Sequence, residues 1–436
     1  MSKLRTAVVL ARTRWGWRPR TRAALERYQQ RRIRAHLRFL RARSPFYADV
    51  RTLAEAPVMD KQTMMANFDA LNTVGVRRAE AEALALAAER SRDFTPMLGN
   101  VAVGLSSGTS GHRGLFLVSP ADRDAWAGTV LALTLPPGLV GHRIALFLRA
   151  NNALYESVRS RLVDFRYFDL TVPVGQHLAD LVEYRPTILV APPSVLRLLA
   201  GAGSRLGGLQ RVYSVAEVLD EGEAESLARA FGQQHLHQLY QCTEGFLART
   251  CEHGVLHLNE QHVLIEPEWL DERRFTPVVT DFSRRTQPIV RYRLNDVLVA
   301  RRGPCPCGSV LRAIERIEGR ADDTLLLDGR VVFADLVSRA VIAADGFTEY
   351  AVVQTGPDRL QVQLDELAAA PAVGVELDRL WQRLGLAAPA VEFVPYAADP
   401  GVKRRRVRRD WQGTADAAVR DRRVGDRPSG PGGAVR

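Results

Sequence analysis

The alternation of strand-like and helix-like segments between residues 143 and 241 is the feature that most constrains the fold. Apolar runs typical of strands lie at 144–148, 187–191 and 212–215, and helical patterns lie at 178–184, 194–200 and 221–231. Strands that alternate with helices form a parallel sheet with helices on its faces. We therefore expect a mixed α/β protein whose large N-terminal domain contains helix-covered, largely parallel sheets.

Two regions with different patterns follow this segment. Strand-like runs without intervening helices predict an additional β subdomain at 263–266, 278–281, 289–292 and 297–300. Beyond Asp322, the order strand, helix, two strands, helix, strand predicts a small α+β C-terminal domain. The segment 414–436 is rich in Gly, Pro, Asp and Arg without apolar periodicity, so we expect it to be disordered.

The positive charge of the chain is concentrated at its two ends. The net charge is +11, and residues 1–50 hold 14 Lys and Arg against 2 acids, while residues 401–436 hold 11 against 4. Such ends can attract nucleic acid or anionic lipid, or they can be solvated faces without a partner. Apolar residues at helical spacing between residues 20 and 43 predict an amphipathic helix in the first of these ends.

Composition argues against two classes of protein. No apolar run approaches the roughly 18 residues that a membrane-spanning helix needs, so neither a transmembrane segment nor a signal peptide is expected. The chain has four cysteines, which is too few for a disulfide scaffold and favours a reducing, cytoplasmic compartment.

A loop of glycines and hydroxyl residues separates two strand-like runs at 101–105 and 115–118. It consists of Ser106, Ser107, Gly108, Thr109, Ser110 and Gly111. Glycines let backbone N–H groups turn toward an anion, and hydroxyls add donors without bulk, so the loop is suited to a phosphate. It is not a Walker A loop, because no Gly-Lys-Ser/Thr follows and a strand comes next. By itself, such a stretch is also typical of a flexible hairpin turn.

Three further motifs follow the loop in the chain. They are Tyr-Gln-Cys-Thr-Glu-Gly at 240–245, Arg-Tyr-Arg-Leu-Asn-Asp at 291–296 and Gly-Arg-Ala-Asp-Asp at 319–323. Each motif by itself could equally be a turn or a surface ion pair. In this order, the four motifs resemble those of the adenylate-forming superfamily, which includes acyl-CoA synthetases and luciferases. The similarity is greatest to the phenylacetate-CoA ligase branch, close to enzymes related to coenzyme F synthetase, and covers roughly residues 40 to 410.

The resemblance implies an ATP- and Mg²⁺-dependent ligase. Such an enzyme converts a carboxylic acid into an acyl-adenylate with release of pyrophosphate. It then transfers the acyl group to a thiol, of CoA or a carrier protein, or to an amine. The implied domains are a basic helical N-terminal extension at 1–50, a large AMP-binding domain at 51–321, a small mobile domain at 322–412 and a disordered tail at 413–436.

The resemblance also assigns roles to single residues of the nucleotide site. The loop at 106–111 holds phosphates, Ala216 and Glu217 line the adenine, and Tyr240 stacks on it. Thr243 donates to the α-phosphate and Glu244 binds Mg²⁺, for which a carboxylate oxygen is a suitable ligand. Asp296 accepts both ribose hydroxyls, and Arg320 lies near the ribose.

Two elements of the implied mechanism lie toward the C-terminus. Asp322 is the hinge between the domains, and Lys403 is the catalytic lysine that follows the charge moving to the bridging oxygen. One departure from the family's pattern concerns the loop, where His112, followed by Arg113, replaces the usual lysine. This departure leaves a catalytically silent nucleotide-binding protein as an alternative, beside a polyanion- or membrane-binding protein that uses its basic ends.

A pocket for the acid is expected beside the sheet edge that follows Leu148. Its candidate residues are Asn151, Asn152 and Tyr155, with Arg149 close in sequence. An aromatic or other hydrophobic acid is what the nearest relatives of the family suggest.

Three of the four cysteines form a candidate metal site. Cys305 and Cys307 are two residues apart, and Cys251 with His257 would complete a tetrahedral set for a structural Zn²⁺. The spacing matches no standard zinc finger, but some relatives carry zinc at similar residues. His253 could replace His257, and buried inert thiols are the remaining alternative.

Overall fold

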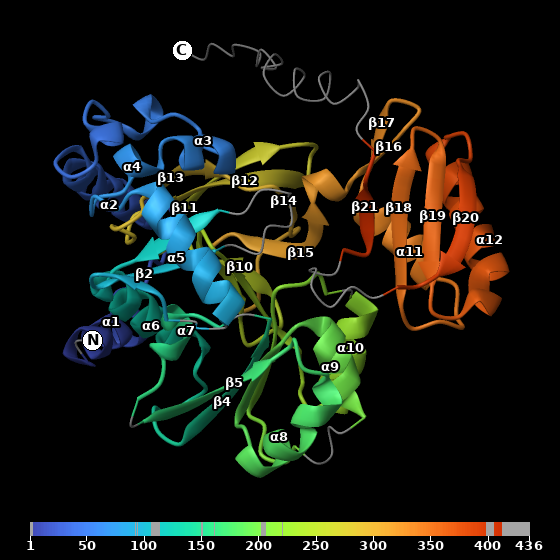
Figure 1. Ribbon diagram of the computed structural model, residues 1–436, viewed down its shortest axis with the longest axis horizontal. Helices are drawn as coiled ribbons and strands as arrows, with labels where there is room; N and C mark the ends of the chain where they lie inside the picture. The colour runs from blue at the N-terminus through green and yellow to red at the C-terminus, as the bar shows by residue number, and fades with distance from the viewer. Residues whose placement is uncertain are drawn as a thin grey trace. The chain divides into compact units, whose positions relative to one another are not determined.

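The computed structural model describes residues 3–91, 93, 95–105, 114–149, 151–160, 162–201, 206–219, 221–397 and 405–411. The described chain divides into two compact units, of which the first ends at Ile317 and the second begins at Glu318. Figure 1 shows their elements in chain order. The predicted loop at 106–111, with His112 and Arg113, lies outside the described residues, as do Lys403 and the tail.

A 12-stranded mixed sheet forms the framework of the first unit, and its parallel part confirms the expected alternation of strands and helices. Five neighbouring strands in the order β5-β4-β6-β7-β8 run parallel. Their bounds are β4 His142–Leu148, β5 Val163–Asp169, β6 Ile188–Ala191, β7 Arg211–Ser214 and β8 His237–Cys242.

The predicted β subdomain is the antiparallel part of this same sheet. Strand β8 pairs in parallel with β7 on one side and antiparallel with β9 on the other, so the two halves are continuous. The remaining strands are β9 Gly245–Thr250, β10 Leu256–Leu258, β11 Val263–Trp269, β12 Arg274–Asp281, β13 Ile289–Arg293, β14 Asp296–Ala300 and β15 Ala313–Arg320.

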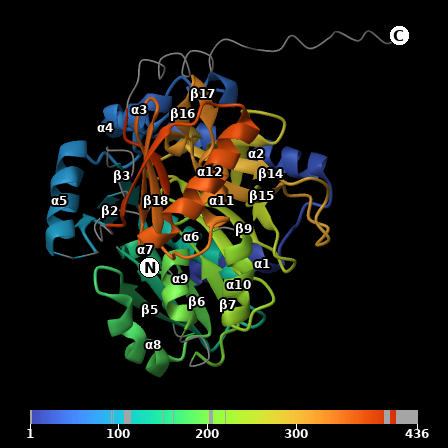
Figure 2. The same ribbon diagram turned by 90° about the vertical axis from the view of Figure 1, so that its right-hand side faces the viewer.

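Alternate residues of the central parallel strands pack on opposite faces of the sheet. Ala145 and Phe147 of β4 pack in one core cluster with helices α8 to α10, and Ile144 and Leu146 pack in another with α6. A strand buried on both faces reads as a continuous apolar run, which is why residues 144–148 predict it well. Helices α9 and α10 lie side by side over β6 and β7 (Figure 2).

The helices before and around the sheet begin near the N-terminus. They are α1 Lys3–Trp15, α2 Arg22–Arg41, α3 Lys61–Ala66, α4 Phe68–Leu71, α5 Arg78–Ser91, α6 Pro120–Thr134, α7 Ala153–Glu156, α8 Leu178–Tyr184, α9 Pro193–Ala200 and α10 Glu221–Ala230. Short 3₁₀ helices lie at η1 Pro45–Tyr47, η2 Leu53–Glu55 and η3 Val174–His177. Helix α2 confirms the predicted amphipathic helix, since Ile33, Leu37 and Leu40 belong to the core that the antiparallel strands form.

A small three-stranded sheet carries the ends of the predicted loop. Its strands are β1 Met97–Leu98, β2 Val101–Leu105 and β3 Leu115–Val118, in the order β1-β2-β3. Strands β2 and β3 are antiparallel, with Leu105 opposite Leu115, so the loop 106–114 joins two paired strand ends. Ser119 caps α6 through the backbone N–H of Asp122, as its Ser-Pro start predicts.

The second unit is a small α+β fold, as the sequence predicts. Two sheets form it, the hairpin β16-β17 and a four-stranded sheet in the order β20-β19-β18-β21. Helices α11 and α12 pack on a core that includes Trp381. The elements are η5 Ala321–Asp323, β16 Leu325–Leu327, β17 Arg330–Val332, α11 Ala334–Ile342, β18 Tyr350–Gly356, β19 Arg359–Leu364, η6 Leu367–Ala369, α12 Ala370–Leu384, β20 Ala390–Pro395 and β21 Val407–Arg409.

Candidate functional site

The carboxyl end of β8 is where the sheet changes from parallel to antiparallel. Only Thr243 and Glu244 lie between β8 and β9, so both residues stand at this edge of the sheet. The guanidinium of Arg284 donates a hydrogen bond to the carbonyl oxygen of Thr243. Ligands of open α/β sheets bind at the carboxyl ends of parallel strands, so the turn lies where such a site is expected.

Tyr240 and Asp296 lie far apart in the sequence and meet at this edge. The Tyr240 hydroxyl donates to Oδ2 of Asp296, which begins β14. Burial, and then the charge of Asp296, raises the pKa of Tyr240 well above its ordinary value. The tyrosine therefore stays protonated and acts as a donor that orients the carboxylate.

Glu244 reaches the same neighbourhood from the turn. Burial, followed by the charge of Glu244 and a hydrogen bond with it, raises the pKa of Tyr292. Burial also raises the pKa of Cys242, with Glu244 and Asp296 as the next causes. The fold therefore brings together Tyr240, Glu244 and Asp296 of the predicted site, and adds Cys242 and Tyr292. We call these five residues the tyrosine–carboxylate cluster.

An N-terminal segment holds the strand that carries Tyr292. Met59 pairs with Tyr292 in an isolated parallel bridge, and its N–H donates to the Arg291 carbonyl oxygen at 2.9 Å. Arg291 adopts a φ of 46°, a left-handed conformation that is uncommon for a residue with a side chain. Asp60, next in the chain, caps α3 by accepting from the Thr63 N–H at 2.8 Å.

Ala216 and Glu217, predicted beside the adenine, follow the end of β7. Ala216 has a φ of 66°, which is also left-handed. The Glu217 carboxylate accepts from the Ser194 N–H at 3.2 Å and from its hydroxyl at 3.0 Å, in the first turn of α9. The Glu217 side chain thus holds the strand end to a helix start, where a carboxylate is favoured by the helix dipole.

The predicted acid-pocket residues divide into two kinds. The Asn151 amide donates to Glu156 at 2.6 Å, and Asn152 caps α7 by accepting from the N–H groups of Leu154 and Tyr155. Both asparagine side chains therefore serve local structure.

Tyr155, by contrast, lies close to Cys242 in the 240–245 motif. Its ring packs edge-on against Trp126 at 5.8 Å, and burial, with Cys242 as the next cause, raises its pKa to about 12. The Trp126 indole N–H donates to Oε1 of Gln241 at 3.4 Å. Sequence reasoning missed Trp126, because nothing local in α6 distinguishes it from a core residue.

Several other predicted residues lie in or near the second unit. Arg320 ends β15 and Asp322 lies in η5. Asp323, the next residue, accepts a forked ion pair from Arg405, which precedes β21. This pair joins η5 to the segment that follows Lys403 in the chain.

The four predicted metal ligands converge on one point. The ligand atoms of Cys251, His257, Cys305 and Cys307 all lie within 4.8 Å of one another, and we call them the Cys/His cluster. The sulfurs of Cys251 and Cys305 are 3.7 Å apart, and the Cys307 sulfur lies 3.4 Å from His257 Nε2.

These distances fit a tetrahedral zinc ion. With Zn–S bonds of about 2.3 Å and Zn–N bonds of about 2.1 Å, the expected edges are about 3.8 Å and 3.6 Å. The Cys251–Cys305 distance is far too long for a disulfide, for which S–S is about 2.05 Å. Burial lowers the pKa of His257, which favours the neutral imidazole that a metal ligand requires. His253 contacts the cluster through its backbone N–H, which donates to Cys251.

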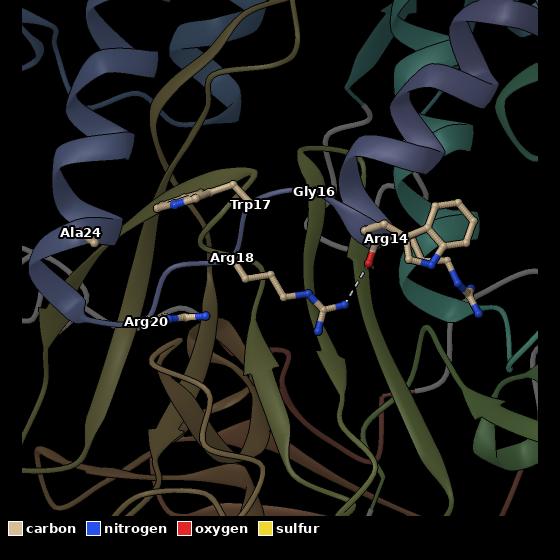
Figure 3. Close-up of a pocket in the computed structure, with 7 residues that line it drawn as sticks. Arg14, Gly16, Trp17, Arg18, Arg20 and Ala24 are labelled. Atoms are coloured by element: carbon tan, nitrogen blue, oxygen red, sulfur yellow. Dashed lines mark hydrogen bonds between the residues drawn. The ribbon is translucent and has the colours of Figure 1, made fainter.

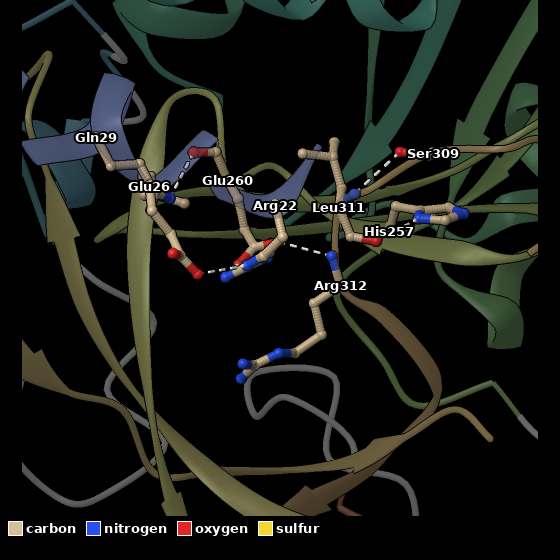
Figure 4. A network of polar contacts seen from close by, with 9 residues as sticks. Arg22, Glu26, Gln29, His257, Glu260, Ser309, Leu311 and Arg312 are labelled. Atoms are coloured by element: carbon tan, nitrogen blue, oxygen red, sulfur yellow. Dashed lines mark hydrogen bonds and ion pairs between the residues drawn. The ribbon is translucent and has the colours of Figure 1, made fainter. Parts of the chain in front are cut away.

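A second layer of contacts orients His257. Its Nδ1 hydrogen-bonds to the Leu311 carbonyl oxygen at 3.2 Å, which leaves Nε2 for a metal. The N–H of the same peptide group, on Arg312, donates to Glu260 at 2.6 Å. Glu260 is 0% exposed and forms a forked pair with Arg22 of α2, at 2.6 and 2.7 Å (Figure 4). The buried Glu260, paired with the half-buried Arg22 of the N-terminal helix, thus holds the peptide group that orients His257.

Comparisons with known proteins identify the fold. No family model and no curated protein matches the sequence. The crystal structure of 2-hydroxyisobutyryl-CoA ligase in the postadenylation state, in complex with 2-HIB-AMP, is similar at a TM-score of 0.69 and 17% identity, covering 93% of both chains. The same ligase with 2-HIB-AMP and CoA in the thioesterification state gives a TM-score of 0.55 at 18% identity over 94% of both chains.

Two other ligases match over a smaller part of the chain. ATP-bound MatB from Rhodopseudomonas palustris gives a TM-score of 0.52 at 14% identity, over 74% of this chain and 67% of its own. The amide bond synthetase McbA from Marinactinospora thermotolerans gives 0.52 at 16%, over 70% and 67%. The chain therefore has the mixed α/β fold of adenylate-forming ligases. Among the described residues, no helix is long and apolar enough to cross a membrane.

Proposed function

We propose that this protein uses ATP and Mg²⁺ to convert a carboxylic acid into an acyl-adenylate, releasing pyrophosphate, and then transfers the acyl group to a thiol or an amine. The observation that carries the proposal is the meeting of Tyr240, Glu244 and Asp296 at the carboxyl end of β8. The fold that holds them is similar, over 93% of the chain, to that of a ligase in complex with 2-HIB-AMP. The phenylacetate-CoA ligase-like branch is part of the proposal.

The residues of the tyrosine–carboxylate cluster divide the work of binding ATP. Asp296, oriented by the Tyr240 hydroxyl, accepts the two ribose hydroxyls, and the Tyr240 ring faces the adenine with the backbone of Ala216 and Glu217. Glu244 supplies an oxygen ligand to Mg²⁺, and Thr243 donates to the α-phosphate. Arg320 is assigned to the ribose, and the loop at 106–111 to the β- and γ-phosphates.

The chemical step requires positioning and charge stabilisation more than covalent help. The substrate carboxylate attacks the α-phosphorus in line, the bond to the bridging oxygen breaks, and pyrophosphate leaves with the negative charge. Lys403 stabilises that charge, and rotation of the small domain about Asp322 then brings the acceptor to the adenylate.

The acid pocket is assigned to Tyr155 and Trp126, with Gln241 as the polar group beside them. Two aromatic rings in an edge-on pair make an apolar wall, so an aromatic or other hydrophobic acid suits it. The acceptor is assigned by class alone, as the thiol of CoA or of a carrier protein, or an amine.

The Cys/His cluster is assigned a structural zinc ion. The ion would fix the end of β9, strand β10 and the β14–β15 loop to one another. It would take no part in the reaction, because four protein ligands leave no open coordination position.

ATP–pyrophosphate exchange with a panel of carboxylic acids tests the function. Wild-type protein should exchange with at least one hydrophobic acid, and Lys403→Ala should reduce that exchange by about tenfold to a hundredfold, since a charge-assisted hydrogen bond contributes about 1.5–3 kcal/mol. Lys3→Ala is the matched control, because this lysine is exposed on α1. ATP binding without exchange across the panel would instead favour a silent nucleotide-binding protein.

A further inference from the structure

Helix α1 carries an apolar stripe on its solvent side. Leu4, Val8, Ala11 and Trp15 follow one another at intervals of four, three and four residues, which places them on one helix face. Leu4 is 75% exposed, Val8 46% and Trp15 62%, and Ala11 is also exposed. A run of exposed apolar side chains on one helix face is unusual in a protein that meets only water.

The opposite face of α1 is fixed to the protein. At Gly128 of α6, an added Cβ would lie 2.6 Å from the Thr6 carbonyl oxygen and 2.8 Å from Val9 Cβ, so the two helices touch there. Arg14 also donates to the carbonyl oxygens of Leu135 and Pro136, just beyond α6, at 3.1 and 2.6 Å. The stripe therefore points outward because its helix is held by the other side.

The segment that carries the stripe, residues 3–20, contains several cations and no Asp or Glu. The first acidic residue of the chain is Glu26, beyond α1 and the link to α2. The exposed cations of this segment are Lys3, Arg5, Arg12, Arg18 and Arg20. Apolar side chains flanked by cations on one exposed surface are typical of helices that lie in a membrane interface.

An open groove continues this surface past the end of α1. It has a volume of about 850 Å³ and is lined by Arg14, Trp15, Gly16, Trp17, Arg18, Arg20 and Ala24. Figure 3 shows Trp17, Arg18 and Arg20 on the link between the two helices. Trp17 is 51% exposed, and its ring packs at a tilt against Tyr28 of α2, with 5.0 Å between the ring centroids, so the ring is held in place at the groove.

We propose that α1 and the α1–α2 link bind the surface of an anionic phospholipid bilayer. Leu4, Val8 and Trp15 enter the region between headgroups and acyl chains, Trp17 lies at the headgroup level, and the arginines meet lipid phosphates. The phosphates of a nucleic acid would pair with the arginines, but the aliphatic side chains of the stripe would stay exposed to water. A second copy of the chain would cover the stripe but bring two cationic segments together.

Sedimentation of the purified full chain with vesicles tests this surface. Binding to phosphatidylcholine vesicles that contain phosphatidylserine should exceed binding to pure phosphatidylcholine vesicles by at least tenfold. Added salt should weaken the binding, because it screens the arginines, without abolishing it. The double variant Leu4→Ser/Val8→Ser should lose at least tenfold in vesicle affinity, and it should fold normally because both side chains are exposed.

A control variant and an activity measurement show whether vesicle binding depends on the α1 stripe in particular. The matched control Leu367→Ser/Val375→Ser, which changes two exposed apolar residues of the second unit, should bind vesicles as wild type does. Equal vesicle affinity of wild type and the α1 variant would overturn the proposal. So would binding of a DNA duplex without vesicle binding, or a dimer that the α1 variant abolishes. Pyrophosphate exchange of the α1 variant should match wild type, so this surface and the adenylation activity are tested separately.

Discussion

The Cys/His cluster and the tyrosine–carboxylate cluster belong to the same sheet but are built differently. In the first, four donor atoms face one another at metal-site distances, and the Arg22–Glu260 ion pair holds the peptide group that orients His257. In the second, tyrosine hydroxyls contact carboxylates that are half-buried, so carboxylate lone pairs remain for a ligand. The contrast suggests that one cluster maintains the framework while the other performs chemistry, and four changes test that division.

The largest expected effect follows from removing one metal ligand. Cys305→Ser should lower zinc affinity by at least a hundredfold and should lower the free energy of unfolding by several kcal/mol, because metal binding is coupled to folding. Zinc content after dialysis against a chelator, together with thermal unfolding, measures both quantities. Cys242→Ser, which changes the thiol outside this cluster, should retain zinc. Wild-type protein whose melting temperature does not respond to zinc would contradict the structural role.

Removing the Arg22–Glu260 ion pair, which lies behind His257, should have the next largest effect. Arg22→Ala leaves the buried Glu260 carboxylate without this cation, and because the Arg22 side chain is 38% exposed and solvent screens the pair, the loss should be about 1–3 kcal/mol. Urea denaturation measures the loss. The exposed pair Arg229 and Glu225 provides the control, since Arg229→Ala should cost less than about 1 kcal/mol.

Zinc affinity of the same variant tests whether the ion pair also orients His257. If the Leu311–Arg312 peptide orients His257 through Glu260, Arg22→Ala should also weaken zinc binding, by about tenfold to a hundredfold. A stability loss with unchanged zinc affinity would restrict the ion pair to a packing role.

The tyrosine–carboxylate cluster should respond in activity and not in stability. Glu244→Gln removes the charge of the proposed Mg²⁺ ligand and should reduce pyrophosphate exchange by about tenfold to a hundredfold. Its unfolding free energy should stay within about 1 kcal/mol of wild type, because Glu244 is half-buried in a turn. The matched control is Glu225→Gln, on the exposed face of α10. Full exchange activity in Glu244→Gln would remove this residue from the site.

The sequence predicts the elements whose pattern repeats locally and misses those that depend on a partner. Residues 144–148 form a continuous apolar run because β4 is buried on both faces, and they were predicted correctly. Strand β5 lies at the sheet edge, where Asp164 and Arg166 face water and interrupt the run, so it was missed. Strand β21 was also missed, since Val407 is the only apolar residue within a basic stretch.

The candidate sites repeat this lesson at the level of residues. The four residues proposed from the sequence as zinc ligands lie together in the structure, although Cys251 and Cys305 are 54 positions apart and no spacing rule predicts their meeting. Tyr240, Glu244 and Asp296 were predicted from motifs, but the hydroxyl–carboxylate contact required the fold. Tyr292 and Trp126 gain their importance from neighbours that are distant in the sequence, such as Met59 for Tyr292 and Gln241 for Trp126, and local patterns do not encode these contacts.

The smallest expected effect is a pH dependence shared by the two regions. Burial, followed by nearby arginines, lowers the pKa of His36 on α2 and of His237 on β8 to about 4. The unfolded chain takes up these protons near pH 6.5, while the folded chain does so only near pH 4, so stability falls as pH decreases between these values and is flat above them. At pH 5.5, each histidine should cost about 1 kcal/mol relative to pH 7.5.

Two variants separate the contributions of these histidines. His36→Gln and His237→Gln should each reduce the loss of unfolding free energy between pH 7.5 and 5.5 by about 1 kcal/mol, as urea denaturation would measure. Helix α2 carries Arg22 and so belongs to the framework side, while β8 carries Tyr240. Equal reductions would mean that both regions unfold together, because each proton is then linked to the same transition. If only one variant changed the pH dependence, the two clusters would belong to separately unfolding parts of the sheet.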